Sequence, residues 1–223
     1  MASQTKAGGE KEMTVICPTV TAYDPHEYRD QMERIQPFAR RVHIDLMDGR
    51  FAPTKSPGLN HVWWPDNVSA DIHLMYARPL PQLPMLVRLR PNMVIIHAEA
   101  EVDHANFAAG LHKVGIRAGL ALLQDTSVES VKGIVKSFDH VLIFSGHLGY
   151  HGGQANLSLT RKIPEIRALR SDVEIGWDGG VNDQNAGRLA GADVDVLDVG
   201  GYISDAKDPA LAYRDLQSAL TAR

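Results

Sequence analysis

Eight short apolar runs with strand-like composition recur along the chain, and a longer segment with helical spacing of apolar residues follows each one. Their centres lie about 21 to 33 residues apart, which is the length of one βα unit. Eight units without a linker predict a single α/β domain closed as a (β/α)8 TIM barrel, whereas six would favour an open doubly wound sheet. The runs are TVIC (14–17), RVHIDLM (41–47), ADIHLM (70–75), MVIIHA (93–98), IRAGLAL (116–122), HVLIFS (140–145), VEIGWD (173–178) and VDVLDV (194–199).

The segments between the runs support this prediction. Several begin after Asp, Ser, Thr or Asn, which are residues that cap the first turn of a helix. Gly115 and Gly191 stand where a helix should turn into the next strand. The proline-rich segment 79–91 predicts a helix that is short or begins late. Apolar residues recur at helical spacing in 27–38, 105–115, 128–138, 157–170 and 182–192.

Composition narrows the classes of function. The 223 residues carry a formal net charge of -4, which argues against a nucleic-acid-binding protein with a basic surface. The single cysteine, Cys17, cannot form an intramolecular disulfide, and no apolar run reaches the roughly 20 residues that span a bilayer. We therefore expect a cytoplasmic protein without a membrane partner. Residues 1–12 read as a flexible polar tail, and 13–223 as the barrel domain.

The predicted strand ends carry polar residues that a strand interior rarely holds. In a parallel barrel the reactive groups lie at the C-terminal ends of the strands, where the βα loops form a pocket. His43 and Asp45 are two residues apart in the second strand, so both side chains point to the same side. The third strand carries His73, and the seventh ends at Asp178.

These two imidazoles and two carboxylates predict a site for one divalent ion at the mouth of the barrel. Zinc, iron, manganese or cobalt accept such a mixed set of nitrogen and oxygen ligands. Either histidine alone would more often be a packed core residue. Two buried aspartates beside two histidines need a partner, however, because an unpaired buried charge is costly.

The strings around these residues resemble the ribulose-phosphate 3-epimerase family. The resemblance is strongest in VHIDLMDGRFAP (42–53), DIHLM (71–75) and DGGV (178–181), and it extends from ICPT (16–19) to the glycines at 200–201. It implies a divalent metal ion as cofactor and a sugar phosphate as substrate. The implied metal ligands are His43, Asp45, His73 and Asp178, and the two aspartates are also the implied acid and base.

The implied reaction inverts C3 of a ketose phosphate, converting D-ribulose 5-phosphate to D-xylulose 5-phosphate in the pentose phosphate pathway. The C3 proton is acidic because the negative charge spreads onto the neighbouring carbonyl oxygen, and a metal would stabilise that enediolate. Asp45 and Asp178 come from opposite sides of the barrel, so one can remove a proton and the other return one to the opposite face. Asp48 and Gly49 are more typical of a loop turn, and we leave Asp48 outside the catalytic set.

Glycines gather in the loops expected to bind the phosphate. Barrels often hold phosphate in the loops after the seventh and eighth strands, through backbone N–H groups and a helix N-terminus. Tight turns also use glycine pairs, but three sets at neighbouring strand ends favour phosphate, and the resemblance assigns them to it. With one threonine and two methionines that match residues near the family's substrate, the expected substrate-binding set is Thr19, Met47, Met75, Gly149, Gly152, Gly153, Gly179, Gly180, Gly200 and Gly201.

Other polar residues have two interpretations. His97 and Glu99 share one side of the fourth strand, where they could orient a ligand or a substrate hydroxyl, or be structural. His147 and His151 could contact the substrate, or be solvated loop histidines. The family's habit, together with the tryptophans at 63 and 64, favours a homo-oligomer.

The loop after the sixth strand departs from the family's pattern. The family has a methionine and then Asn-Pro-Gly-Phe-Gly-Gly-Gln, whereas this chain reads FSGHLGYHGGQ (144–154), with Phe144 for the methionine and His151 as an apparent insertion. Asp198 and Gly201 replace a small apolar residue and a serine. These changes are expected around the substrate more than the metal. The ketose phosphate could therefore be a related one, such as allulose 6-phosphate.

Two other functions remain open at this point. A metal-free barrel of the orotidine-phosphate decarboxylase type relies on a lysine among the strand-end aspartates, which HIDLMDGR (43–50) lacks. A non-catalytic barrel that binds sugar phosphate has only the altered sixth-strand loop in its favour. Retention of two opposed carboxylates counts against it, since a binding protein has no use for them.

Overall fold

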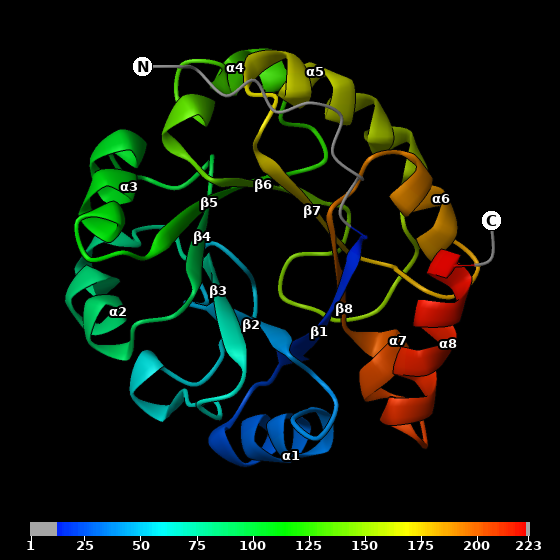
Figure 1. Cartoon of the computed structure of the whole chain (residues 1–223). Coiled ribbons are helices and arrows are strands. Elements are labelled where there is room, and N and C mark those ends of the chain that lie inside the picture. The colour runs from blue at the N-terminus through cyan, green and yellow to red at the C-terminus, as the bar shows by residue number, and fades with distance from the viewer. Residues whose placement is uncertain (1–12, 222–223) are drawn as a thin grey trace, which may run out of the picture.

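The computed structural model describes residues 13–221 and has eight parallel strands that close into one barrel, in the order β1 to β8 (Figure 1). All eight predicted runs are strands, so the predicted TIM barrel is confirmed. Only β1 differs by more than two residues from its run, because it continues to Thr21. The strands are β1 Val15–Thr21, β2 Arg41–Met47, β3 Ser69–Met75, β4 Met93–His97, β5 Arg117–Leu122, β6 His140–Phe144, β7 Glu174–Asp178 and β8 Val196–Val199. The predicted tail, 1–12, lies outside the described residues.

Helices surround the barrel, and several are shorter than the sequence pattern predicts. The segment 128–138 forms only one α-helical turn and one 3₁₀ turn, and 79–91 holds the short, late helix that its prolines predict. The α-helices are α1 Pro25–Ile35, α2 Leu83–Leu89, α3 His104–His112, α4 Val128–Val131, α5 Lys162–Leu169, α6 Ala186–Gly191, α7 Gly201–Ser204 and α8 Pro209–Thr221. The 3₁₀ helices are η1 Leu59–His61, η2 Leu80–Gln82, η3 Val135–Ser137 and η4 Leu157–Arg161.

Capping side chains stand at the start of several helices, as the sequence predicts. Asp24 precedes α1, and its Oδ1 accepts hydrogen bonds from the backbone N–H groups of His26 at 2.8 Å and Glu27 at 3.0 Å. At the end of α6 the prediction is wrong by two residues. Gly191 is the last helical residue, and Asp193 makes the left-handed turn, with φ 76°.

Strand residues alternate between two environments. Those facing the helices, such as Ile44, Leu46, Ile72 and Trp177, are fully buried in the main hydrophobic core. The residues that face the barrel axis differ in polarity from one group of strands to another. On β4 to β6 the middle of the interior is apolar and forms a separate small cluster of Met93, Ile95, Ala121 and Leu142, while the same strands also carry the buried His97 and His140. On the remaining strands the residues that face the axis are largely polar, which places most ionisable groups of the interior on one side.

An ionic cluster lies at the N-terminal end of the barrel, on the polar side of the interior. The guanidinium of Arg41 donates to both carboxylate oxygens of Glu174 at 2.9 Å and to Asp71 at 2.6 Å. His140 and Arg117 also contact Glu174, at 2.8 and 3.1 Å. Burial would raise the pKa of Glu174, but the hydrogen bonds from Arg41 and His140 outweigh it and lower the pKa. Charged groups at this end of a barrel serve stability rather than chemistry.

The strand register brings polar side chains together at the opposite, C-terminal end. Asp45 on β2 is the direct partner of Thr21 on β1 and of His73 on β3. Asp178 on β7 is the partner of Asp198 on β8. Residues far apart in the chain therefore become neighbours around one mouth. No helix within residues 13–221 is long and apolar enough to cross a membrane.

Replacing Glu174 by Gln should lower the stability of the barrel at neutral pH. The substitution leaves Arg41 partly unpaired in a buried position, which costs about 3 kcal/mol and corresponds to a fall of roughly 6–12 °C in melting temperature. Because the pKa of Glu174 is lowered by folding, its stabilisation is fully present above the unfolded pKa of about 4.3 and declines progressively as the pH falls from there toward the lower folded-state pKa. Thermal melts at pH 7 and at pH 3.5 test both statements.

The control is Glu101→Gln, since Glu101 forms an exposed pair with Arg78. This change should alter stability by less than about 1 kcal/mol at either pH. Equal melting temperatures for the Glu174 variant and the wild type at pH 7 would contradict the stabilising role of the cluster.

Candidate active site and metal centre

Four ligand-type side chains converge at the C-terminal mouth of the barrel, as the sequence predicts. One ligand atom from each of His43, Asp45, His73 and Asp178 lies within 4.8 Å of the others. His43 Nε2, His73 Nδ1 and Asp45 Oδ1 form a triangle with sides of 3.0 to 3.2 Å. Asp178 Oδ2 lies 3.9 Å from His73 Nδ1. Both histidines are fully buried, and both aspartates are almost so.

The donor set and its spacing fit a divalent metal ion. Ligand atoms about 2.0–2.1 Å from an ion lie about 3.0 Å apart on an octahedral edge and about 3.4 Å apart on a tetrahedral edge. The three sides of the triangle fall within this range. Two neutral imidazoles with two carboxylates are also ligands that transition-metal ions and zinc accept. We therefore consider these four residues a candidate metal centre.

In each candidate histidine ligand, the ring nitrogen that faces away from the metal centre lies close to a polar side chain. Nε2 of His73 lies 2.9 Å from Nε2 of His97, on the far side of the ring from Asp45. Nδ1 of His97 lies 3.4 Å from Oε2 of Glu99, whose other oxygen, Oε1, accepts a hydrogen bond from the hydroxyl of Thr126. His97 and Glu99 thus form a chain behind a ligand, and they are not among the residues lining the pocket. The geometry favours the ligand-orienting interpretation of these two residues.

His43 is held by a different group. Its Nδ1 lies 3.3 Å from Oδ1 of Asp198 on β8. The expectation that Asp198 lies near the substrate is wrong, because the carboxylate is buried behind the ring of His43 and does not line the pocket.

The two candidate catalytic carboxylates have different surroundings. Burial would raise the pKa of Asp45, but hydrogen bonds from His43 and His73 and their charge outweigh it and lower the pKa. Burial raises the pKa of Asp178 well above its usual range, and the negative charge of Asp45 adds to the effect. Burial also lowers the pKa of His73 to about 4, against the opposing hydrogen bond to Asp45. The site therefore combines one carboxyl group whose pKa is lowered with one whose pKa is raised.

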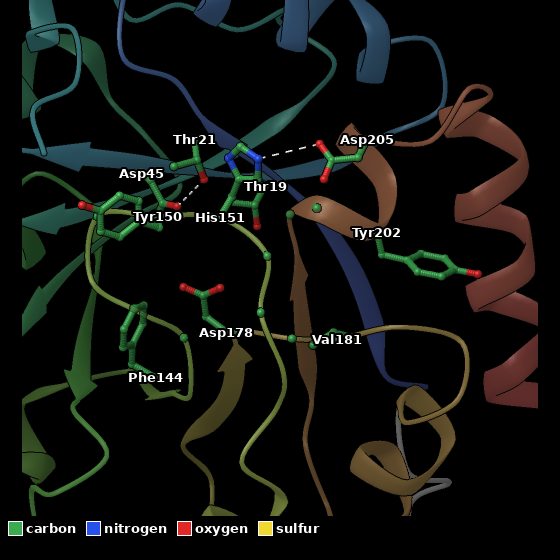
Figure 2. A pocket seen from close by; sticks show the side chains of 18 of the residues that line it. Thr19, Thr21, Asp45, Phe144, Tyr150, His151, Asp178, Val181, Tyr202 and Asp205 are labelled. Carbon is green, nitrogen blue, oxygen red and sulfur yellow. Dashed lines mark hydrogen bonds and ion pairs between the residues drawn. The ribbon is translucent and has the colours of Figure 1, made fainter.

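Sequence reasoning overlooked Thr21. Its hydroxyl donates a 2.7 Å hydrogen bond to Oδ2 of Asp45, the oxygen not shared with the histidines (Figure 2). Thr21 follows Thr19 by two residues on β1, so both side chains point into the mouth. That alternation was the available signal, but the sequence alone did not show that β1 extends to Thr21.

A pocket opens beside the four candidate ligands, and most of the predicted substrate-binding residues line it. Met47 is the exception, because it packs against Met75 and Ala52 and is not among the lining residues. Figure 2 shows Asp45 and Asp178 reaching into the pocket from β2 and β7, with His151 and Asp205 near its rim. The predicted residues that line it are Thr19, Met75, Gly149, Gly152, Gly153, Gly179, Gly180, Gly200 and Gly201.

The sixth-strand loop forms part of the pocket wall. Tyr150 and His151 line the pocket, and Nε2 of His151 lies 3.7 Å from a carboxylate oxygen of Asp205 (Figure 2). His147 is not among the lining residues. The hydroxyls of Thr54 and Tyr23 donate to the backbone carbonyl of Gly149, at 2.7 and 3.2 Å, and tie the loop to the opposite rim.

Two pocket glycines are required by close backbone packing. Gly179 and Gly180 have φ of 110° and 71°. A Cβ on Gly179 would lie 2.2 Å from the backbone nitrogen of Gly146, and one on Gly180 would lie 2.1 Å from that of Ala155. The loops after β6 and β7 therefore touch through bare backbone. The absence of a Cβ at these glycines permits this contact, and it also leaves backbone groups accessible from the pocket.

Comparison with known proteins agrees with this geometry. The model of the Ribulose-phosphate 3 epimerase family matches residues 15–204. The chain belongs to the ribulose-phosphate 3-epimerase family. The expectation of an epimerase-class isomerase is therefore confirmed at the level of the family.

Individual relatives cover almost the whole chain. A ribulose-phosphate 3-epimerase from Helicobacter pylori is 32% identical over 211 residues, spanning 91% of this chain and 96% of that protein. One from Mycobacterium tuberculosis is 30% identical over 217 residues, spanning 91% of each. The solved structure of 3-keto-L-gulonate-6-phosphate decarboxylase from Vibrio cholerae has a TM-score of 0.70 but only 10% identity, over 94% of this chain and 98% of that one. This last similarity concerns the fold alone.

Substituting Ala for Gly180 should destabilise the protein strongly. The new Cβ would combine a left-handed backbone with a clash against the backbone of the neighbouring loop, and we expect a cost above about 3 kcal/mol. Gly115→Ala is the matched control, because Gly115 also has a positive φ, 78°, but nothing lies within 4 Å of the added atom. It should cost about 1 kcal/mol. Chemical denaturation measures both; equal losses would contradict the loop-contact argument.

Proposed function

We propose that this chain epimerises C3 of a ketose phosphate, interconverting D-ribulose 5-phosphate and D-xylulose 5-phosphate. The observation that carries the proposal is the placement of Asp45 and Asp178 on β2 and β7, facing one pocket beside two buried histidines. Membership of the epimerase family supports the reaction class. The names of the relatives support this pair of substrates.

Inversion at one carbon requires a proton acceptor on one face and a proton donor on the other. Asp45 can serve as one of these, because Thr21 and His73 fix both of its oxygens in position. Asp178 can serve as the other, since it lines the same pocket from a different strand. The roles exchange with the direction of the reaction. Each positioned acid or base contributes typically 10²–10⁴-fold to the rate.

The proposed metal ligands are His43, Asp45, His73 and Asp178. A zinc, iron, manganese or cobalt ion held there would supply a Lewis acid that lowers the cost of negative charge on the substrate beside the exchanged proton. The residues behind the ligands, His97 and Glu99, keep the ring of His73 in a fixed orientation. No redox cofactor enters the proposed reaction.

The phosphate of the substrate is proposed to lie against the glycine loops after β6, β7 and β8. No Lys or Arg is found among the described residues lining the pocket. Backbone N–H groups that glycines leave accessible, together with His151, are therefore the groups proposed to hold the anion. A homo-oligomeric assembly, a cytoplasmic location and the absence of nucleic-acid binding stay predictions.

A related ketose phosphate, such as allulose 6-phosphate, is the second candidate substrate. It is favoured by the pocket wall after β6, where Phe144, Tyr150 and His151 line the space that the sugar would occupy. A non-catalytic sugar-phosphate-binding barrel is the third candidate. It would leave the opposed carboxylates without a function.

The protein loaded with one equivalent of Zn²⁺, Mn²⁺, Fe²⁺ or Co²⁺ should interconvert D-ribulose 5-phosphate and D-xylulose 5-phosphate, and a chelator should abolish the activity. A coupled assay for xylulose 5-phosphate measures the rate, with allulose 6-phosphate tested in parallel. If allulose 6-phosphate is turned over faster, it is the preferred substrate, and the proposed reaction, epimerisation at C3, still holds. If neither sugar is turned over and neither takes up solvent deuterium at C3, the epimerase proposal is wrong and the non-catalytic sugar-phosphate-binding barrel is the candidate that remains.

Asp45→Asn and Asp178→Asn should each reduce kcat by at least about 10²-fold, because each removes one of the two proton-transfer groups. Asp30→Asn, an exposed carboxylate on α1, is the surface control and should retain full activity. Incorporation of solvent deuterium at C3 is the more sensitive measurement. Near-normal rates in either active-site variant, with the fold intact by circular dichroism, would contradict the two-carboxylate mechanism.

A further inference from the structure

Asp198 is a buried carboxylate to which the proposed reaction assigns no role. It lies on β8 with 2% of its surface exposed, and it does not line the substrate pocket. Neither of its oxygens makes a hydrogen bond of ordinary geometry with any group in the described part of the chain. A buried carboxylate without a partner is costly, so the groups around Asp198 should show why it is there.

The nearest donor that Asp198 faces is the imidazole of His43. Oδ1 of Asp198 lies 3.3 Å from Nδ1 of His43, slightly beyond an ordinary N–H···O bond. Nδ1 has no other hydrogen-bond partner among the described residues. The thiol of Cys17, the direct strand partner of Asp198 on β1, also lies beside this carboxylate. The charges of His140, Arg41 and Asp178 act on it as well.

The two nitrogens of His43 face different environments. Nδ1 points to Asp198, whereas Nε2 lies 3.2 Å from both Asp45 Oδ1 and His73 Nδ1 and belongs to the candidate metal centre. A histidine that donates its proton from one ring nitrogen presents the lone pair of the other. A carboxylate behind Nδ1 therefore favours the ring form in which Nε2 is available as a ligand.

The other candidate histidine ligand is held differently. The ring of His97 lies behind Nε2 of His73, and the carboxylate of Glu99 comes one step later. Asp198 faces its histidine directly. A negative charge adjacent to the ring also raises the basicity of the ligand nitrogen, which an imidazole partner does much less.

We propose that Asp198 is a positioning residue that holds His43 protonated on Nδ1, directs Nε2 to the metal centre and thereby strengthens metal binding. This inference rests on the metal site of the proposed function. Asp198 contacts neither the substrate nor the reacting atoms. Its effect on the reaction passes through the affinity and orientation of one ligand.

The test compares Asp198→Asn and Asp198→Val with the full-length wild type. Asn keeps an oxygen that can accept from Nδ1 but removes the charge, whereas Val removes both. Asp71→Asn is the matched control, because Asp71 is an equally buried carboxylate in the barrel interior that bonds to Arg41 and Asn92 instead of a histidine. The dissociation constant for Zn²⁺ is measured by competition with a chelator, after circular dichroism has confirmed the fold of each variant.

We expect Zn²⁺ binding to weaken about 10- to 100-fold in Asp198→Val and by a smaller factor in Asp198→Asn. Asp71→Asn should bind Zn²⁺ within about twofold of the wild type, even if its melting temperature falls. In the Zn²⁺-loaded wild type, NMR of the histidine rings should show a slowly exchanging proton on Nδ1 of His43. That proton should exchange faster in both Asp198 variants.

Several results would overturn the role of Asp198. They are wild-type Zn²⁺ affinity in the folded Asp198 variants, equal weakening in Asp71→Asn, or a His43 ring that carries its proton on Nε2 in the loaded wild type. If Asp198→Val does not fold, the isosteric Asn variant decides the matter by the same measurements. Failure of the wild type to bind Zn²⁺, Mn²⁺, Fe²⁺ or Co²⁺ at these residues is a separate result, because it would refute the proposed metal site itself.

Discussion

Pairing of ionisable side chains inside a closed barrel is the constraint on which the rest of this structure depends. Moving a charge from water into a protein interior costs several kcal/mol unless a partner is close and well oriented. The interior meets this requirement at three levels along the axis. Arg41 faces Glu174 at the N-terminal end, His43 faces Asp198 above it, and His73 faces Asp45 at the mouth.

Most polar groups of the interior lie on one side of the axis, and this asymmetry gives the site its shape. Apolar side chains such as Met93, Ile95 and Leu142 fill the middle of the interior on β4 to β6. They exclude water from that side, which strengthens the electrostatic interactions of the groups opposite. The difference in pKa between Asp45 and Asp178 follows from this environment. One carboxyl group has two imidazole partners, and the other is buried beside a negative charge.

The strands and the loops carry different parts of the proposed function. The residues proposed for proton transfer and metal binding lie on β2, β3 and β7, which are held by the register of the sheet. Most residues around the proposed sugar and phosphate lie on loops after β6, β7 and β8, and the first two of these loops pack against each other through Gly179 and Gly180. A loop can change its side chains without moving the strand ends. The departures from the family's pattern in residues 144–154 are therefore compatible with an intact proton-transfer site.

The sequence by itself determined the eight βα units, the closed barrel and the identity of the four candidate ligands. It could do so because strand periodicity and a pair such as His43 and Asp45, two residues apart, are local properties. Only the tertiary structure decided that Thr21 bonds to Asp45, that His97 stands behind His73 and that Asp198 faces His43. These contacts join different strands, so they depend on the register and closure of the sheet. No local pattern of residues encodes that geometry.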